Sequence, residues 1–155
     1  MKVGLIGLGR MGEGMSRRML KAGIEVWGYR RNYKKAEEAF EKGYVSGVST
    51  DLENLVKIVK STKSIYGEKS GETVYIKTPG IFQLVIPAEL VEDTLNELLP
   101  LLGDGDIIID HGNSNFKDSR RRAERLAKLG IQFIDCGTSG GVYGLERGYC
   151  LMVGG

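Results

Sequence analysis

The stretch that decides the fold is Lys-Val-Gly-Leu-Ile-Gly-Leu-Gly-Arg-Met-Gly, residues 2–12. Residues 2–8 are apolar and β-prone, and residues 10–22 place methionine and leucine at helical spacing before Gly23. The G-x-G-x-x-G motif at 7–12 therefore lies between a predicted strand and a predicted helix. Such a hexapeptide alone can be purely structural, but this position is the one that a dinucleotide-binding turn requires.

Each glycine of the motif has its own physical role. The first permits a sharp turn, the second lets backbone N–H groups approach a pyrophosphate, and the third lets the helix pack on the strand. The start of the helix adds partial positive charge. No Gly-Lys-Ser/Thr follows and the kinase signatures are missing, which excludes a P-loop and a kinase. The candidate cofactor-binding residues of this turn are Gly7, Leu8, Gly9, Arg10, Met11 and Gly12.

The rest of the chain alternates short apolar runs with helical patterns. Further strands are predicted at 24–29, 81–86, 106–110 and 131–136, and helices at 32–43, 52–60, 89–102 and 119–129. This alternation predicts an α/β fold: a doubly wound parallel sheet of the Rossmann type, with ligands at the carboxyl edge of the strands.

Residues 61–80 break this rhythm, because they are polar, rich in turn residues and contain a β-prone piece at 73–77. We predict a surface excursion there, in the form of a hairpin. No linker composition divides the chain, so residues 1–155 are predicted to form one dinucleotide-binding domain.

Composition narrows the class of protein. The 155 residues are 41% hydrophobic and 27% charged, which is typical of a globular domain. Twelve of the 23 glycines fall within residues 4–14 and 137–155. The net charge of +2 gives no support for a nucleic-acid or membrane partner. The basic run at 120–122 is interpreted as a solvated helix face rather than a nucleic-acid site.

Cysteine and histidine usage adds two expectations. Cys136 and Cys150 lie among apolar neighbours and are predicted to be buried free thiols of a reducing compartment. With no apparent targeting or spanning segment, we expect a cytoplasmic protein. One histidine and two separated cysteines make no ligand set, so no metal site is expected.

Arg30 stands at the end of the second predicted strand, where an NAD-binding protein places a carboxylate on the ribose hydroxyls. A guanidinium at this point can pair with a 2′-phosphate, so NADP(H) is favoured and NAD(H) is the second possibility. Arg31 and Asn32 complete this candidate adenosine site. The alternative is a solvated arginine pair at the start of a helix.

Two later loops also carry candidate site residues. Asn113 follows a predicted strand and suits a polyhydroxy substrate or the nicotinamide ribose, although Ser114 or Asn115 in the same loop can simply cap a helix. His111 is either a proton-transfer group or a hydrogen-bonded loop residue. Ser139, Gly140 and Gly141 form a second candidate anion site, because they expose backbone N–H groups.

Three segments together resemble 6-phosphogluconate dehydrogenase, within the 3-hydroxyacid dehydrogenase superfamily: residues 7–12, residues 109–114 and, most specifically, residues 137–155. The resemblance covers nearly the whole chain except 61–80, which looks like an insertion. It implies hydride transfer from C3 of 6-phosphogluconate to NADP, loss of CO₂ and tautomerisation to ribulose 5-phosphate.

The same resemblance implies roles for individual residues. Met11 would touch the nicotinamide side, Pro87 would belong to the cofactor site, and Asn113 would bridge cofactor and substrate. The substrate would be held by Ser139, Gly140 and Gly141. The sequence departs from the family pattern at His111 and Glu89, where glycine is common, and at Arg30, where short NAD-linked relatives have an acid.

In the family, the general-base lysine and the general-acid glutamate lie on a helix beyond the position of Gly155, in an all-helical domain that also forms the homo-oligomer. We therefore expect no catalytic residue on these 155 residues, and no turnover by them alone. The alternatives are a domain of a 3-hydroxyisobutyrate-type dehydrogenase, which the segment 145–149 disfavours, and a freestanding nucleotide-binding module without catalysis.

Overall fold

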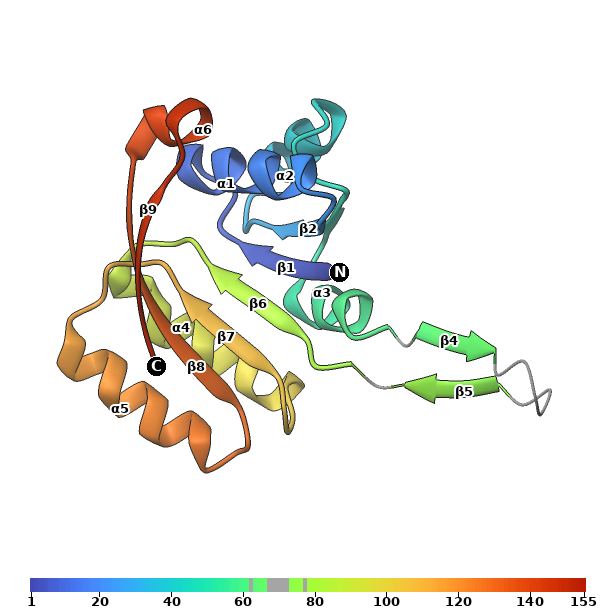
Figure 1. The fold of residues 1–155 in the computed structure, drawn as a ribbon, viewed down its shortest axis with the longest axis vertical. Helices are drawn as coiled ribbons and strands as arrows, with labels where there is room; N and C mark the ends of the chain where they lie inside the picture. Colours follow the sequence, from blue (N-terminus) through green and yellow to red (C-terminus); the bar gives the residue numbers. More distant parts are fainter. Residues whose placement is uncertain (62, 67–72, 77) are drawn as a thin grey trace.

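The computed structural model describes residues 1–61, 63–66, 73–76 and 78–155 (Figure 1). Its main sheet has seven strands in the order β3-β2-β1-β6-β7-β8-β9. Six of them are parallel, and β9 alone runs antiparallel to its neighbour β8. The strands are β1 (Lys2–Ile6), β2 (Glu25–Tyr29), β3 (Gly47–Ser49), β6 (Ile81–Leu84), β7 (Ile107–Asp110), β8 (Gln132–Ser139) and β9 (Cys150–Gly154). The predicted α/β, Rossmann-type fold is confirmed.

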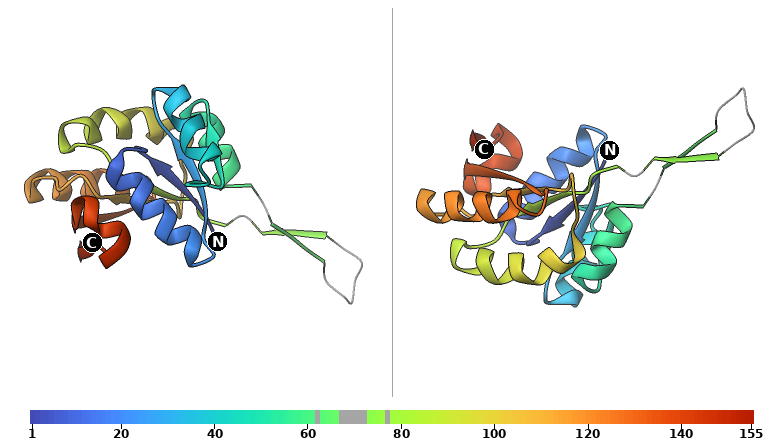
Figure 2. Two further views of the ribbon diagram at one scale, coloured as in Figure 1. Left: turned by 90° about the horizontal axis from the view of Figure 1, so that it is seen from above. Right: turned by 90° about the horizontal axis from the view of Figure 1, so that it is seen from below.

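Helices cover both faces of this sheet, and Figure 2 shows α1 on one side and α4 on the other. The α-helices are α1 (Arg10–Lys21), α2 (Tyr33–Glu41), α3 (Leu52–Val59), α4 (Ala88–Leu98), α5 (Phe116–Ala127) and the short α6 (Gly144–Arg147). Two 3₁₀ turns, η1 (Leu99–Leu101) and η2 (Gly141–Tyr143), extend α4 and precede α6.

Two separate groups of buried side chains hold the layers together. One joins the α1 and α2 side to the first strands, with Leu5, Val26 and Ala36 at its centre. The larger group lies under α3, α4 and α5 and includes Phe82 and Leu95. Burial of this apolar surface is the main source of stability.

The sheet is not parallel throughout, so the prediction was wrong at its far edge. β8 continues to Ser139 instead of ending at 136, and it pairs with β9, which the sequence did not predict. All five residues of β9 are exposed, so they show no alternation between a buried and an exposed face. β3 was also missed, because three residues are too short for a periodic pattern.

A two-stranded antiparallel sheet, β4 (Lys63–Tyr66) with β5 (Thr73–Ile76), projects from the domain (Figure 2). This pairing agrees with the hairpin expected within 61–80. Residues 62, 67–72 and 77 of that segment lie outside the described residues. That the segment is an insertion relative to the family remains a prediction.

The cysteine prediction is half right. Cys136 is buried within β8, whereas Cys150 is exposed because it begins the edge strand β9. Within the described ranges, no helix has both the length and the apolar character needed to cross a membrane.

The turn after β1 brings backbone directly against backbone. Gly7 has φ +106°, and its N–H donates to the Tyr29 carbonyl oxygen at 3.0 Å. A Cβ at Gly7 would collide with the Val85 carbonyl oxygen, and one at Gly12 would collide with the Gly7 carbonyl oxygen. A Cβ at Gly9 would meet nothing within 4 Å. The first and third glycines therefore serve packing, while the second leaves open space.

We expect Gly12→Ala to lower the free energy of unfolding by about 3 kcal/mol, because the new methyl group meets a backbone oxygen that cannot move aside. Gly9→Ser is the matched control: its site is open, its φ of −94° suits any residue, and serine is a good N-cap. Urea denaturation measures both variants. Equal stability of the two would contradict this account of the turn.

Candidate dinucleotide and substrate site

The carboxyl edge of the sheet collects the predicted site residues. The glycine turn follows β1, Arg30 follows β2, Pro87 precedes α4 after β6, and Asn113 follows β7. Ser139 is the last residue of β8, so one edge brings together residues that are far apart in the chain. This is the edge at which open α/β sheets bind ligands.

The glycine turn leads directly into α1. Gly9 is the N-cap, and its carbonyl oxygen accepts a hydrogen bond from the Glu13 N–H at 2.8 Å. The first backbone N–H groups of a helix have no partner within the helix, and they carry partial positive charge. With open space at Gly9, this geometry fits the pyrophosphate of a dinucleotide. Arg10 is exposed and Met11 half-buried at the same helix start.

Leu8 has a buried side chain, so only its backbone is available to a ligand. Its carbonyl oxygen accepts a hydrogen bond from Arg30 Nη1 at 2.7 Å. This bond fixes the Arg30 guanidinium beside the glycine turn. Arg30 is half-buried, unlike the solvated side chain of the alternative interpretation.

A pocket of about 170 Å³ lies at the end of β2, and Gly7, Tyr29, Arg30, Arg31, Leu90 and Glu97 are among the residues that line it. Arg31 is exposed, and its Nη2 lies 3.6 Å from Oε1 of Glu97 on α4. Asn32 has a structural contact of its own, because its Oδ1 accepts from the Lys35 N–H at 3.3 Å and caps α2.

Asn113 has a left-handed backbone, with φ +54°, and its amide faces β8. Its Oδ1 accepts from the Thr138 N–H at 2.9 Å, and its Nδ2 donates to the Thr138 carbonyl oxygen at 3.2 Å. The side chain thus ties the β7 loop to β8. One amide hydrogen and one lone pair remain for a ligand, and the bridging role of Asn113 stays a prediction.

Asn115 caps α5, because its Oδ1 accepts from the Lys117 N–H at 2.9 Å. The capping alternative is therefore correct for this residue, and it explains why α5 begins at Phe116, earlier than predicted.

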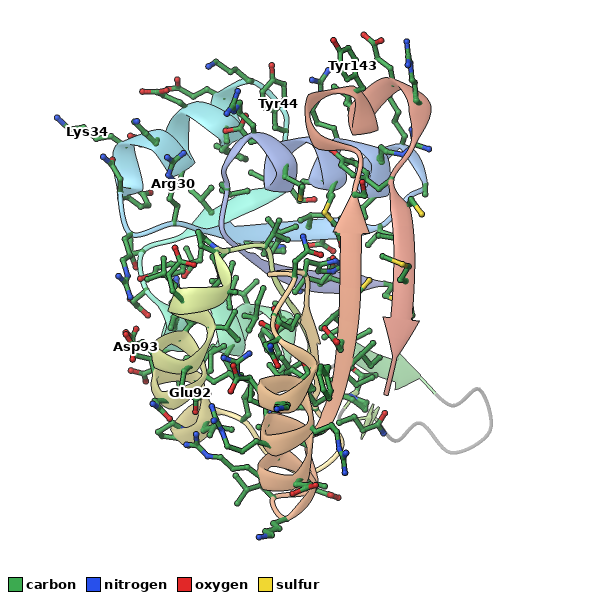
Figure 3. All side chains as sticks on the ribbon, turned by 90° about the vertical axis from the view of Figure 1, so that its left-hand side faces the viewer. Arg30, Lys34, Tyr44, Glu92, Asp93 and Tyr143 are labelled. Carbon is green, nitrogen blue, oxygen red and sulfur yellow. The ribbon has the colours of Figure 1, made fainter. Side chains whose placement is uncertain are left out.

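A largely buried network of ion pairs supports the loop that carries Asn113. This network was not predicted from the sequence. Asp110 has no exposed surface, and its carboxylate accepts from the Gly112 N–H at 2.8 Å and from Ser114 Oγ at 2.7 Å. Arg122 contacts Asp110 Oδ2 at 3.4 Å and Glu92 Oε2 at 3.0 Å. Figure 3 shows Glu92 between α4 and α5.

The prediction that the basic run at 120–122 is a solvated face was therefore wrong for Arg122, which is 5% exposed. A run of three arginines on a helix gives no sign of which one turns inward. The acid at the end of β7, Asp110, was the available signal, because a buried carboxylate needs a buried partner.

His111 is buried beside this loop. Thr138 Oγ1 donates to the Cys136 carbonyl oxygen at 2.9 Å, so it accepts from His111 Nδ1–H at 2.8 Å. This assigns the lone pair to Nε2, which has no partner within the described part of the chain. Burial lowers the pKa of His111, so the ring is neutral at pH 7. His111 is thus hydrogen-bonded within the loop, as one of its two interpretations predicts, and its role in proton transfer stays a prediction.

The second glycine cluster folds back onto α1. Gly140 and Gly141 have φ of +141° and +47°, and η2 and α6 then lie against the helix. Arg18 Nη1 donates to the Leu145 carbonyl oxygen at 3.1 Å. A Cβ at Gly14 would collide with the Tyr149 hydroxyl group. The two glycine-rich stretches of the sequence are therefore in contact.

Among the residues that the structure describes, no group of three or more His, Cys, Asp or Glu side chains is placed to hold a metal ion.

Residues 2–155 match the protein family described as the NAD binding domain of 6-phosphogluconate dehydrogenase. The chain belongs to this family. It is thus an NAD(P)-binding dehydrogenase domain, in agreement with the glycine turn and the resemblance drawn from the three motifs.

Individual members of the family are similar over almost the whole chain. The decarboxylating 6-phosphogluconate dehydrogenase of Candida albicans is 40% identical over 99% of this chain, which spans 27% of that enzyme. The NAD(+)-dependent enzyme of Haloferax volcanii is 36% identical over 100% of this chain, which spans 45% of that enzyme. The chain therefore spans less than half the length of these relatives.

A solved structure shares the fold as well. Plasmodium falciparum 6-phosphogluconate dehydrogenase, whose structures include complexes with NADP+ and with 6-phosphogluconate, superposes with a TM-score of 0.77 at 28% identity. The match covers 100% of this chain and 31% of that protein. The family thus includes proteins described with NADP+ and with NAD+.

The network predicts how stability depends on pH. The Arg122 guanidinium holds the pKa of Glu92 below its ordinary value of 4.5. As pH falls, Glu92 therefore takes up a proton in the unfolded chain before it does so in the folded protein. The stabilisation that ionised Glu92 gives is fully present above about pH 4.5 and is lost as pH falls through the folded pKa. We expect Glu92→Gln to flatten this part of the curve of unfolding free energy against pH. A curve identical in slope to that of the wild type would contradict this role.

Proposed function

We propose that the chain is the cofactor-binding domain of an NADP-linked enzyme that oxidatively decarboxylates 6-phosphogluconate to ribulose 5-phosphate. The observation that carries the proposal is the contact between the two glycine-rich segments across α1. It packs the segment 137–155, which most specifically resembles the family, against α1, the helix that begins at the turn that fits a pyrophosphate. A cofactor and a sugar-acid phosphate can then share one edge of the sheet.

The residues divide this task. The cofactor is bound by the turn at 7–12 together with Arg30, Arg31, Asn32 and Pro87, and Met11 faces its nicotinamide side. Asn113 lies between the two ligands, and the substrate is held by Ser139, Gly140 and Gly141. A nicotinamide held there would supply the hydride acceptor for oxidation of C3 of the substrate. Decarboxylation and tautomerisation need an acid and a base, which the family resemblance assigns to a helix beyond Gly155.

Arg30 supports NADP as the preferred cofactor. Its bond to the Leu8 carbonyl oxygen holds the guanidinium at the site of the adenosine ribose, where a carboxylate would select the 2′-hydroxyl of NAD. One of its five N–H donors serves this bond, which leaves others to pair with a 2′-phosphate.

We expect Arg30→Asp to reverse the cofactor preference, because the new carboxylate repels a 2′-phosphate and accepts hydrogen bonds from ribose hydroxyls. Fluorescence titration of NADPH and NADH measures this ratio. Lys34→Asp is the control, since it makes the same change in charge on α2, where Figure 3 shows Lys34 pointing away from the sheet. Equal affinities of the wild type for both cofactors would remove Arg30 from the account.

The reaction has its own test. An enzyme that joins residues 1–155 to a helical catalytic domain of the family should reduce NADP with 6-phosphogluconate and release CO₂ and ribulose 5-phosphate, but should not reduce NADP with 3-hydroxyisobutyrate. The 155 residues alone should bind NADPH without turnover. Steady production of ribulose 5-phosphate by residues 1–155 would show that the catalytic groups are on this chain. A preference for 3-hydroxyisobutyrate would reject the proposed substrate.

A further inference from the structure

Glu97 occupies an unfavourable position in its own helix. It lies in the last turn of α4, and no basic side chain accompanies it there. The carboxyl end of a helix carries partial negative charge, so a carboxylate at this point costs stability. Helix formation therefore gives no reason for an acid at residue 97.

What Glu97 contacts is the candidate adenosine pocket. Its Oε1 lies 3.6 Å from Arg31 Nη2, and both residues line the pocket that Arg30 also lines. Both side chains of the pair are more than half exposed. An ion pair in such a setting is weak and can exchange for another partner.

The negative charge of Glu97 also acts on the floor of the pocket. Burial raises the pKa of the Tyr29 phenol, the charge of Glu97 raises it further, Arg31 opposes this effect, and Asp51 adds a smaller effect in the same direction as Glu97. Glu97 is the carboxylate that lines the pocket together with Arg30 and Arg31. A ligand with a phosphate in this pocket would be repelled by it.

The two arginines differ in how they are held. Arg30 is fixed by the backbone of the glycine turn, through the Leu8 carbonyl oxygen. Arg31 is held by a side chain, the carboxylate of Glu97. A 2′-phosphate can therefore use Arg30 where it stands, but it must compete with Glu97 for Arg31.

We propose that Glu97 is a specificity-determining residue, which weakens the binding of 2′-phosphorylated dinucleotides by competing for Arg31 and by repelling the phosphate. A dinucleotide with a free 2′-hydroxyl carries no charge at this position and is little affected. The inference rests on the proposed placement of the adenosine ribose beside Arg30 and Arg31. It does not require that NADPH be preferred overall.

Titration of NADPH and NADH into wild-type chain and Glu97→Gln tests the proposal. We expect NADPH to bind about two- to five-fold more tightly to the variant, and NADH to change by less than about two-fold. The gain should shrink between about 0.05 and 0.5 M salt, because the interaction is electrostatic and solvent-exposed. Thermal unfolding checks that the variant is folded, which the position of Glu97 in α4 leads us to expect.

Asp93→Asn is the matched control. Asp93 is exposed one turn earlier on α4, it is not among the residues that line the pocket, and Figure 3 shows it on the outer side of the helix. The substitution Asp93→Asn removes the same charge from α4 but leaves the ion pair between Glu97 and Arg31 in place. An equal gain in Asp93→Asn, an unchanged affinity for NADPH in Glu97→Gln, or an equal gain for NADH would each overturn the proposal.

A double-mutant cycle tests the part assigned to Arg31. In the Arg31→Ala background, Glu97→Gln should keep only the smaller gain for NADPH that comes from removing the repulsion, because no competition for Arg31 remains. Retention of the full effect would overturn competition as the mechanism. A wrong placement of the cofactor would give a different result. The wild type would then bind NADPH and NADH with equal affinity, and Arg30→Asp would change neither affinity.

Discussion

Contact between backbone atoms at the first glycine turn determines the rest of the site. Gly12 packs on the Gly7 carbonyl oxygen, and Gly7 packs on the Val85 carbonyl oxygen of the neighbouring strand connection. This packing sets the direction in which α1 leaves β1, and hence where the positive end of the helix points. It also places the Leu8 carbonyl oxygen within reach of Arg30. A methyl group at Gly7 or Gly12 would alter all of these relations together.

Paired charges then arrange the loops around that turn, and α4 supplies two of the acids. Glu92 reaches toward α5 and meets the buried Arg122, which in turn contacts Asp110 under the Asn113 loop. Glu97, near the other end of the helix, reaches toward the end of β2 and meets Arg31. One pair is largely buried and supports structure, whereas the other is exposed and can exchange its partner for a ligand.

The sequence predicted the parts of the fold that depend on local pattern. The glycine turn, the first strands and the capped helices follow from periodicity and from residues with special backbone conformations. The inward turn of Arg122, the pairing of the Asn113 amide with Thr138, and the antiparallel β9 did not follow. Each depends on a neighbour distant in the chain, and neither composition nor spacing reports which partner a polar side chain or an edge strand will meet.

Tyr149 packs against two glycines, Gly14 and Gly144, so substitutions at these three positions depend on one another. Its ring fills space that a side chain at Gly14 or Gly144 would need, and its hydroxyl group lies 3.5 Å from the Met11 carbonyl oxygen. Neither glycine can acquire a side chain while the tyrosine remains, and a smaller residue at 149 would leave a void between them. These three positions should therefore change together or not at all as related sequences diverge, although more than 100 residues separate the first from the others.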